Sequence, residues 1–173
     1  MYEETLVRKA RMYADTRGLE LAETLGSGKD GIVLVAKFKD KPGDVAIKIL
    51  HSEESYRREK ETYQRLKQLQ ITTMHGFNVP QLIRFDDELL VLEMTIVRRP
   101  FVLDFASAYL DARPEFSAEI WEAWESEKRE QFESRWSVVL RVMQTLQGYG
   151  IYLLDVSPSN IAFLDEGESS ENR

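Results

Sequence analysis

Three glycines and one lysine near the N-terminus have the types and spacing of a phosphate-binding loop. Gly26, Gly28 and Gly31 form the pattern G-x-G-x-x-G, and Lys48 follows in the apolar run VAIKIL. Glycine allows a backbone to approach a phosphate because no Cβ stands in the way. A lysine in an apolar run needs an anionic partner, since an unpaired buried ammonium is costly. Such a triplet also occurs in simple hairpin turns, so its surroundings decide between the two interpretations.

The elements expected around the glycines favour a phosphate loop between two strands. Residues 19–25 and 32–39 are both predicted strands. The glycines therefore do not open a helix, as they do in a dinucleotide-binding βαβ unit. The last glycine is also not followed by the Lys-Ser/Thr pair of a Walker loop.

A second group of chemical residues lies near the other end of the sequence, in YLLDVSPSNIAF. Asp155 and Asn160 have the spacing D-x-x-x-x-N. An aspartate can accept the proton of an attacking hydroxyl, and an asparagine oxygen can ligate Mg²⁺. The same residue types are also good turn formers. Their position after the glycine loop and the lysine favours phosphoryl-transfer chemistry.

In this order the motifs resemble those of the protein-kinase superfamily, from about Leu19 to Leu164. G-x-G-x-x-G-x-V, V-A-I-K and D-x-x-x-x-N match its glycine loop, nucleotide lysine and catalytic loop. GSGKD and DVSPSN are similar to the corresponding loops of RIO-type kinases. The resemblance implies an α+β, protein-kinase-like fold: a five-stranded antiparallel N-lobe sheet with one C-helix, plus a partial helical C-lobe.

The resemblance also implies a glutamate partner for Lys48 on the next helix. Glu59 and Glu61 are the two candidates. In kinases, apolar residues follow this glutamate at i+4 and i+7, to pack the helix on the sheet. Tyr63 and Leu66 occupy these positions after Glu59, whereas polar residues follow Glu61, so we expect Glu59 to pair with Lys48.

The other implied roles are contacts with ATP and Mg²⁺. Asp155 would orient the acceptor hydroxyl, a Ser/Thr-type hydroxyl by resemblance, and Asn160 would ligate Mg²⁺. Leu92 would lie at the back of the adenine pocket, and backbone groups near Glu93 and Thr95 would meet the adenine edge. The full set of expected nucleotide contacts is Gly26, Ser27, Gly28, Lys29, Gly31, Val33, Ala46, Lys48, Leu92, Glu93 and Thr95.

The sequence predicts four parts: an N-terminal helix at 1–18, an ATP-binding N-lobe at 19–95, a partial C-lobe with the catalytic loop at 96–164, and a polar tail at 165–173. The tail is expected to be frayed. Within these parts the predicted strands are 19–25, 32–39, 45–50, 81–85, 89–93 and 161–164. The predicted helices are 2–17, 55–69, 101–110 and a stretch from 117 to 149 that breaks once.

Two departures from the kinase pattern affect the expected activity. Leu153 and Leu154 replace the usual His-Arg, so we expect no control through an activation-loop phosphate. Asp165-Glu166-Gly167 lies too close to Asp155 to be the D-F-G motif, and we interpret it as a turn. D-F-G and the substrate-binding helical lobe would then be missing, either from a fragment of a kinase or from a natural truncated relative. We therefore expect weak nucleotide binding and little turnover.

Composition limits the other function classes. The net charge of -7 argues against a broad nucleic-acid surface. The sequence contains no cysteine, which fits a cytoplasmic location, and no apolar run is long enough for a membrane span. Two alternatives stay open: a non-catalytic pseudokinase or interaction module, with residues 115–136 and their tryptophans as its partner surface, and a small-molecule or lipopolysaccharide kinase on the same fold.

Overall fold

The computed structural model describes residues 2–165, which divide into two compact units. Unit 1 contains residues 2–70 and 80–96, and unit 2 contains residues 71–79 and 97–165. The boundary between the two predicted lobes was expected at 95/96, close to the observed boundary between Ile96 and Val97. The sequence did not reveal that 71–79 belongs to unit 2. Residues 166–173 of the predicted tail lie outside the described residues.

Unit 1 is built on a five-stranded antiparallel sheet with the order β1-β2-β3-β7-β6. Each strand lies where the sequence predicted one, and the α+β class with a five-stranded antiparallel sheet is confirmed. The strands are β1 (Leu19–Ser27), β2 (Gly31–Phe38), β3 (Asp44–Leu50), β6 (Leu82–Asp86) and β7 (Val91–Met94).

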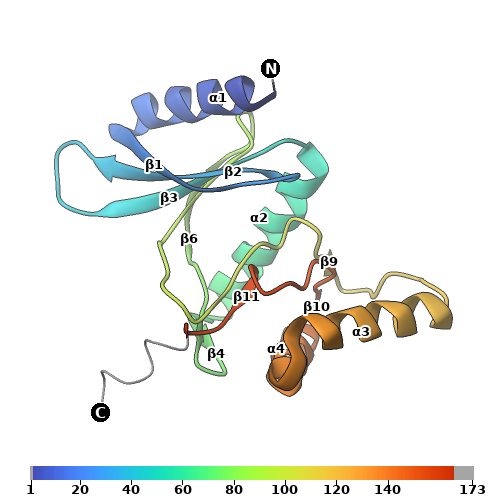
Figure 1. Cartoon of the computed structure of the whole chain (residues 1–173). Helices are drawn as coiled ribbons and strands as arrows, with labels where there is room; N and C mark the ends of the chain where they lie inside the picture. The colour runs from blue at the N-terminus through green and yellow to red at the C-terminus, as the bar shows by residue number, and fades with distance from the viewer. Residues whose placement is uncertain (1, 166–173) are drawn as a thin grey trace, which may run out of the picture. The chain divides into compact units, whose positions relative to one another are not determined.

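Two helices cover opposite faces of this sheet (Figure 1). Helix α1 (Tyr2–Arg17) buries Leu6, Ala10 and Tyr13 in one hydrophobic cluster with Ile47 of β3. Helix α2 (Glu53–Gln68) begins after Ser52, whose hydroxyl accepts the Ser55 amide at 3.1 Å. Because side chains alternate along a strand, the neighbour of Ile47, Lys48, faces α2.

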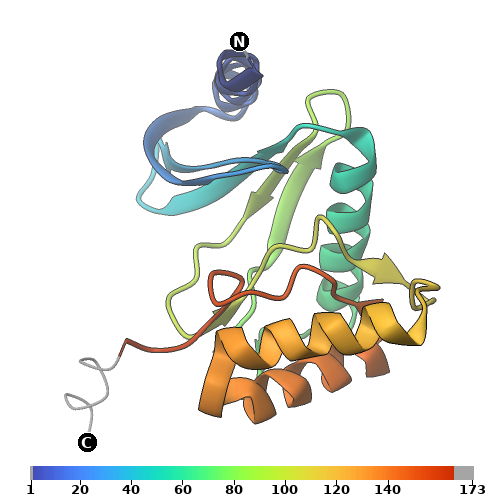
Figure 2. The same cartoon turned by 45° about the vertical axis from the view of Figure 1, so that its right-hand side comes forward.

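Unit 2 contains the second pair of α-helices of the described residues (Figure 2). Helix α3 (Ala118–Phe132) is followed by the 3₁₀ turn η1 (Glu133–Arg135) and by α4 (Trp136–Gly148). The sequence predicted one break in this stretch, and the break lies at Glu133, whose φ of 51° is outside the helical range. Among the described residues, no helix is both long and apolar enough to cross a bilayer.

The predicted helix at 101–110 is wrong. The segment is instead two short strands joined by a turn, β8 (Phe101–Val102) and β9 (Tyr109–Leu110). Asp104, in the turn, has a φ of 69°, which ends any helical run. The strands of unit 2 form two sheets: β11-β8-β5-β4 and β10-β9, with β4 at Thr73–Met74, β5 at Phe77–Asn78, β10 at Ile151–Tyr152 and β11 at Ile161–Ala162.

Candidate functional site

The glycine loop is the hairpin between β1 and β2, closed by a hydrogen bond from the Gly28 amide to the Gly31 carbonyl at 2.9 Å. The glycines are not equivalent. A Cβ on Gly31 would stand 2.0 Å from the carbonyl oxygen of Ile49, whereas a Cβ on Gly26 or Gly28 would meet no atom within 4 Å. Gly31 is therefore required by the packing of β2 on β3. Gly26 and Gly28 leave open space beside an exposed backbone.

Lys48 and Glu59 form a buried ion pair between β3 and α2. The Lys48 Nζ donates to Glu59 Oε1 at 2.9 Å and lies 2.7 Å from Oε2. The two side chains are 7% and 1% exposed. This is the pair that the sequence selected. The face of α2 that buries Tyr56 and Tyr63 also directs Glu59 at the sheet.

The strand expected to lead into the adenine site, β7, carries a second buried carboxylate. Glu93 is fully buried and accepts hydrogen bonds from Tyr13 Oη at 2.7 Å and from Arg17 Nε and Nη2, both at 2.9 Å. Burial raises the pKa of Glu93, but the hydrogen bonds from Arg17 and Tyr13 outweigh it and leave the pKa below its usual value. The Glu93 side chain thus binds α1 and is not available to a ligand. No pattern in the sequence indicated this contact.

Thr95 follows β7 and is hydrogen-bonded to the segment before β6. Its amide donates to the Gln81 carbonyl at 3.0 Å, and its hydroxyl accepts the Gln81 amide at 2.9 Å. The Thr95 amide is therefore used inside unit 1. Any contact between Thr95 and a base would fall to its carbonyl or its hydroxyl proton.

The remaining predicted nucleotide contacts of unit 1 line up along the same strands. Leu92 is fully buried and lies opposite Lys48 in the β3–β7 pair, while Val33 lies opposite Lys48 in the β2–β3 pair. Ala46 is buried opposite Met94. Ser27 and Lys29 are exposed at the hairpin.

In unit 2 the structure brings Asp155 and Asn160 together. The Asn160 side-chain nitrogen donates to the Asp155 carbonyl at 3.0 Å, and the Asp155 amide donates to Ser107 Oγ at 3.2 Å. The Ser157 carbonyl accepts the amides of Asn160 and Ile161 at 3.0 and 2.9 Å, which makes a tight turn directly before β11. Asn160 is only 7% exposed, so its amide group is held in place.

Sequence reasoning missed one acidic residue beside this loop. A carboxylate oxygen of Asp104 lies within 4.8 Å of one of Asp155. The backbones are also linked, because the Leu103 amide donates to the Asn160 carbonyl at 2.9 Å. Asp165, by contrast, has a side chain 70% exposed that pairs with Arg99 at 2.7 Å. Carboxylate and amide oxygens are the ligands that Mg²⁺ prefers, so Asp104, Asp155 and Asn160 are the residues of unit 2 that fit a cation.

The tryptophan-rich segment 115–136 is only partly exposed. Phe132 and Trp136 are 4% and 7% exposed, which removes them from the expected partner surface. Trp124 donates its indole N–H to the Leu154 carbonyl at 3.3 Å. Trp121 is half-buried, with the Arg113 guanidinium 3.7 Å from its ring centre.

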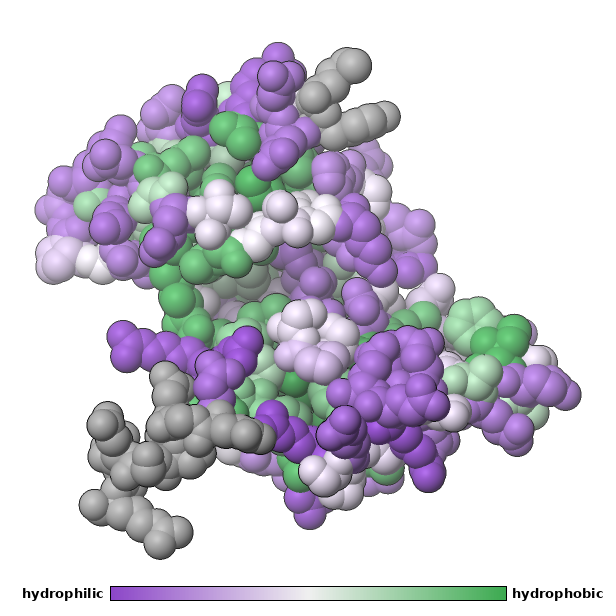
Figure 3. Space-filling view, viewed as in Figure 1, coloured by the Kyte–Doolittle hydropathy of each residue, from purple (hydrophilic) through white to green (hydrophobic). Residues whose placement is uncertain are grey.

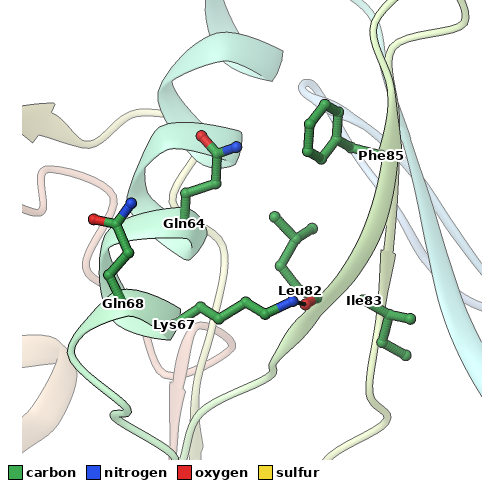
Figure 4. Close-up of a pocket in the computed structure, with 6 residues that line it drawn as sticks. All are labelled: Gln64, Lys67, Gln68, Leu82, Ile83 and Phe85. Atoms are coloured by element: carbon green, nitrogen blue, oxygen red, sulfur yellow. Dashed lines mark hydrogen bonds between the residues drawn. The ribbon is translucent and has the colours of Figure 1, made fainter.

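A pocket of unit 1 lies between α2 and β6 (Figure 4). Lys67 crosses it to donate to the Leu82 carbonyl at 2.8 Å. Its lining residues are Gln64, Lys67, Gln68, Leu82, Ile83 and Phe85. None of these residues was predicted to bind the nucleotide.

The sequence matches no protein-family model and no curated protein. The interpretation of the site therefore rests on its own residues and geometry.

Proposed function

We propose that this chain binds Mg-ATP in the manner of a protein kinase and belongs to a phosphotransferase that moves the γ-phosphoryl group to a hydroxyl. The observation that carries the proposal is the buried pair of Lys48 and Glu59, which lies one strand away from the glycine hairpin. The fold of unit 1 is compatible with a kinase N-lobe but is not specific to it. The ion pair adds chemistry that a purely structural sheet does not need.

The role of the pair follows from its charges. A buried ammonium without a partner is costly, and Glu59 removes that cost by hydrogen bonding. The same contact fixes the direction of the lysine side chain, which would otherwise be flexible. A lysine held in this way can donate to nucleotide phosphates without first losing conformational freedom.

The second half of the proposed chemistry belongs to unit 2. Asp155 would accept the proton of the attacking hydroxyl. The oxygen of that hydroxyl would bond to the γ-phosphorus while the bond from the γ-phosphorus to ADP breaks. Mg²⁺, when bound, would neutralise phosphate charge, and Asn160 would hold it through its amide oxygen. The Asn160 side-chain nitrogen donates to the Asp155 backbone carbonyl, which ties Asn160 to the residue that would act as the base. The acceptor is a protein hydroxyl or, as the second possibility within this class, a small-molecule hydroxyl.

A thermal-shift titration with Mg-ATP tests the nucleotide site. We expect stabilisation of about 2.7 kcal/mol at one hundred times Kd, or roughly 5–10 °C for a chain of this size. Lys48→Ala should abolish the shift. The matched control is Lys37→Ala, which removes an exposed lysine from neighbouring β2 and should leave the shift unchanged.

Lys48→Ala leaves the Glu59 carboxyl buried, so its starting Tm should be lower than that of the wild type. The comparison is therefore made between ligand-induced shifts and not between starting temperatures. Absence of a shift for the wild type at millimolar Mg-ATP would refute the nucleotide site.

A non-catalytic interaction module is the second candidate function. Phe116 and Ile120, at the start of α3, are 45% and 53% exposed, and Figure 3 shows hydrophobic surface in this region. Sedimentation velocity of the wild type and of Ile120→Glu tests whether these residues join two copies. A monomeric wild type at high protein concentration would exclude that role.

A further inference from the structure

One peptide group of unit 2, the group that joins Leu154 to Asp155, is hydrogen-bonded on both sides by side chains. Its N–H, which belongs to Asp155, donates to Ser107 Oγ at 3.2 Å. Its carbonyl, which belongs to Leu154, accepts the indole N–H of Trp124 at 3.3 Å. The N–H and C=O of a trans peptide point in opposite directions, so Ser107 and Trp124 approach this group from opposite sides. We call these two side chains the Ser107–Trp124 clamp.

The clamp lies where the strand pairing of β10 has ended. Strand β10 pairs with β9 at Ile151 and Tyr152, and Asp155 follows beyond that ladder. A backbone group that is shielded from water needs a hydrogen-bond partner even outside a ladder. For the peptide group before Asp155, side chains from two distant segments provide these partners. They therefore hold the backbone of the residue that we propose as the base.

Ser107 is placed by the turn between β8 and β9. The Ala108 amide donates to the Phe105 carbonyl at 2.9 Å, which closes the turn. The neighbours of Ser107, Ala106 and Ala108, are 2% and 0% exposed. Because both neighbours are packed inside unit 2, the Ser107 hydroxyl cannot leave the Asp155 amide without disturbing that packing.

Trp124 is placed by α3 and by a second indole ring. The rings of Trp121 and Trp124 meet edge to face, with their centres 5.7 Å apart and an angle of 82° between their planes. This contact and the half-buried position of Trp124 limit the orientations of its side chain. The sequence placed Trp124 in a possible partner surface, whereas its N–H is used by the loop that carries Asp155.

We infer that Ser107 and Trp124 are positioning residues of the phosphotransfer reaction and act by holding the backbone of Asp155. The inference rests on the proposed function, in which the Asp155 carboxylate accepts the proton of the attacking hydroxyl. A base must lie within hydrogen-bonding distance of that proton. The clamp prevents rotation of the peptide group directly before the Asp155 Cα, and so fixes the direction of its carboxylate. Neither clamp residue needs to touch ATP or Mg²⁺.

Mg-ATP hydrolysis by the full chain tests this inference. In this assay the oxygen of water bonds to the γ-phosphorus, the bond to ADP breaks and a water proton passes to Asp155. Ser107→Ala removes the acceptor of the Asp155 amide, and Trp124→Phe removes the indole donor but keeps an aromatic ring. We expect each variant to lower kcat roughly tenfold, with KM for Mg-ATP within about twofold of the wild type.

The double variant adds a test of the shared peptide group. Ser107 and Trp124 bind the two polar groups of one peptide, so their effects should be coupled. The combined loss in kcat should therefore be clearly smaller than the product of the two single losses. A loss equal to that product would mean that the two side chains act independently, which would overturn the clamp.

Two controls separate positioning from folding. Ser126→Ala removes an exposed hydroxyl from α3 and should leave kcat unchanged. Trp124→Phe leaves the Leu154 carbonyl with the Val156 amide, which donates to it at 3.0 Å. This variant therefore keeps that carbonyl bonded and carries the test if Ser107→Ala does not fold.

The outcomes separate this inference from the proposed function. A wild-type rate no higher than that of Asp155→Asn would overturn the proposed base and the clamp with it. An Asp155-dependent rate whose kcat is unchanged in Ser107→Ala and Trp124→Phe would overturn the positioning role alone. A lower Tm together with that unchanged kcat would show that both side chains serve only to satisfy backbone groups. The nucleotide site is judged separately, by the Lys48→Ala titration.

Discussion

Gly31 shows that a residue of a ligand-binding motif can be required by packing alone. A methyl group there would stand 2.0 Å from a carbonyl oxygen of the neighbouring strand, whereas Gly28 has open space. We predict that Gly31→Ala lowers the free energy of unfolding by about 2 kcal/mol or more. Gly28→Ala should change it by less than about 0.5 kcal/mol. Urea unfolding of the two variants measures both values.

The two glycine variants also separate effects on stability from effects on nucleotide binding. If Gly28 provides close backbone approach to a phosphate, Gly28→Ala should weaken Mg-ATP binding by roughly tenfold, or about 1.4 kcal/mol, in a protein of unchanged stability. Calorimetric titration gives the affinity. Equal affinity for Gly28→Ala and the wild type would mean that the hairpin does not touch the phosphates.

Arg17 is the second residue whose effect can be isolated, because it neutralises buried Glu93. We predict that Arg17→Met destabilises the protein by roughly 3 kcal/mol at pH 7. The pKa of Glu93 is lowered in the fold. The stabilisation of the fold by ionised Glu93 is therefore present above the ordinary glutamate pKa of about 4.3. It is lost as the pH falls through the lower pKa that Glu93 has in the folded protein.

The difference between Arg17→Met and the wild type should accordingly shrink in acid. Urea unfolding at pH 7 and near pH 3 measures it, with Arg11→Met, an exposed arginine on the same helix, as the control. A difference that is the same at both pH values would show that Arg17 acts through packing and not through charge.

At the residue scale, the sequence allowed prediction of contacts between residues that belong to recognisable local motifs. The pairing of Lys48 with Glu59 could be predicted, because the resemblance implies a glutamate on the next helix and the apolar residues at i+4 and i+7 select Glu59. The contact of Arg17 with Glu93 could not, because it joins residues far apart in sequence and neither belongs to a motif. Asp104 was missed for a different reason: it lies far from Asp155 in the sequence, and only the pairing of β8 with β11 brings the two carboxylates close.

A hydrogen-bonded group in the β6–β7 hairpin is among the contacts that position α2. Asp87, in the β6–β7 hairpin, accepts the Tyr56 hydroxyl at 2.7 Å and Lys60 at 2.6 Å. Lys60 also lies 4.8 Å from the ring centre of Phe85. Tyr56 and Lys60 lie on either side of Glu59 in α2. Their contacts with Asp87 therefore hold the part of the helix that carries Glu59 against the sheet.

Asp87→Ala should therefore loosen α2 and leave the Tyr56 hydroxyl without its acceptor. We predict a loss of about 1 kcal/mol, since the carboxylate is largely exposed but the phenol is buried. Glu88→Ala, an exposed acid of the same hairpin, is the control. Equal unfolding midpoints in urea for the two variants would contradict this role.

Among the elements, strands bounded by turns were predictable and isolated short strands were not. Strands β2, β3 and β7 are apolar runs rich in Val, Ile and Leu, and the β1–β2, β2–β3 and β6–β7 connections contain Gly or Asp. The segment 101–110 contains no such run, because β8 and β9 are two residues long and much of the turn between them is buried. Its apolar spacing imitates a helix, and only the partner strands β11 and β10 decide otherwise.

The molecule as a whole is not divided at one point of the chain, because residues 71–79 belong to unit 2. The Asn78 amide donates to the Pro100 carbonyl at 2.8 Å, and Asn78 pairs with Phe101 of β8. This short excursion is therefore stabilised by contacts that form only when later residues are in place.

Hydrogen exchange can show whether the units open independently. We predict that the Asn78 amide exchanges together with Leu103 of unit 2 and that Gly31→Ala speeds exchange at Leu50 of unit 1 by more than tenfold while Asn78 changes little. Native-state exchange followed by NMR measures the three amides. Acceleration of Asn78 in step with Leu50 would indicate a single cooperative unit.

The order of strands in unit 2 has a consequence for biosynthesis. Strands β8 and β9 leave the ribosome before α3 and α4, whereas their partners β10 and β11 follow these helices. Until then both strands present unpaired edges, which favour contacts with other chains. Translation speed through residues 118–148 thus sets how long the nascent chain is exposed to misassembly.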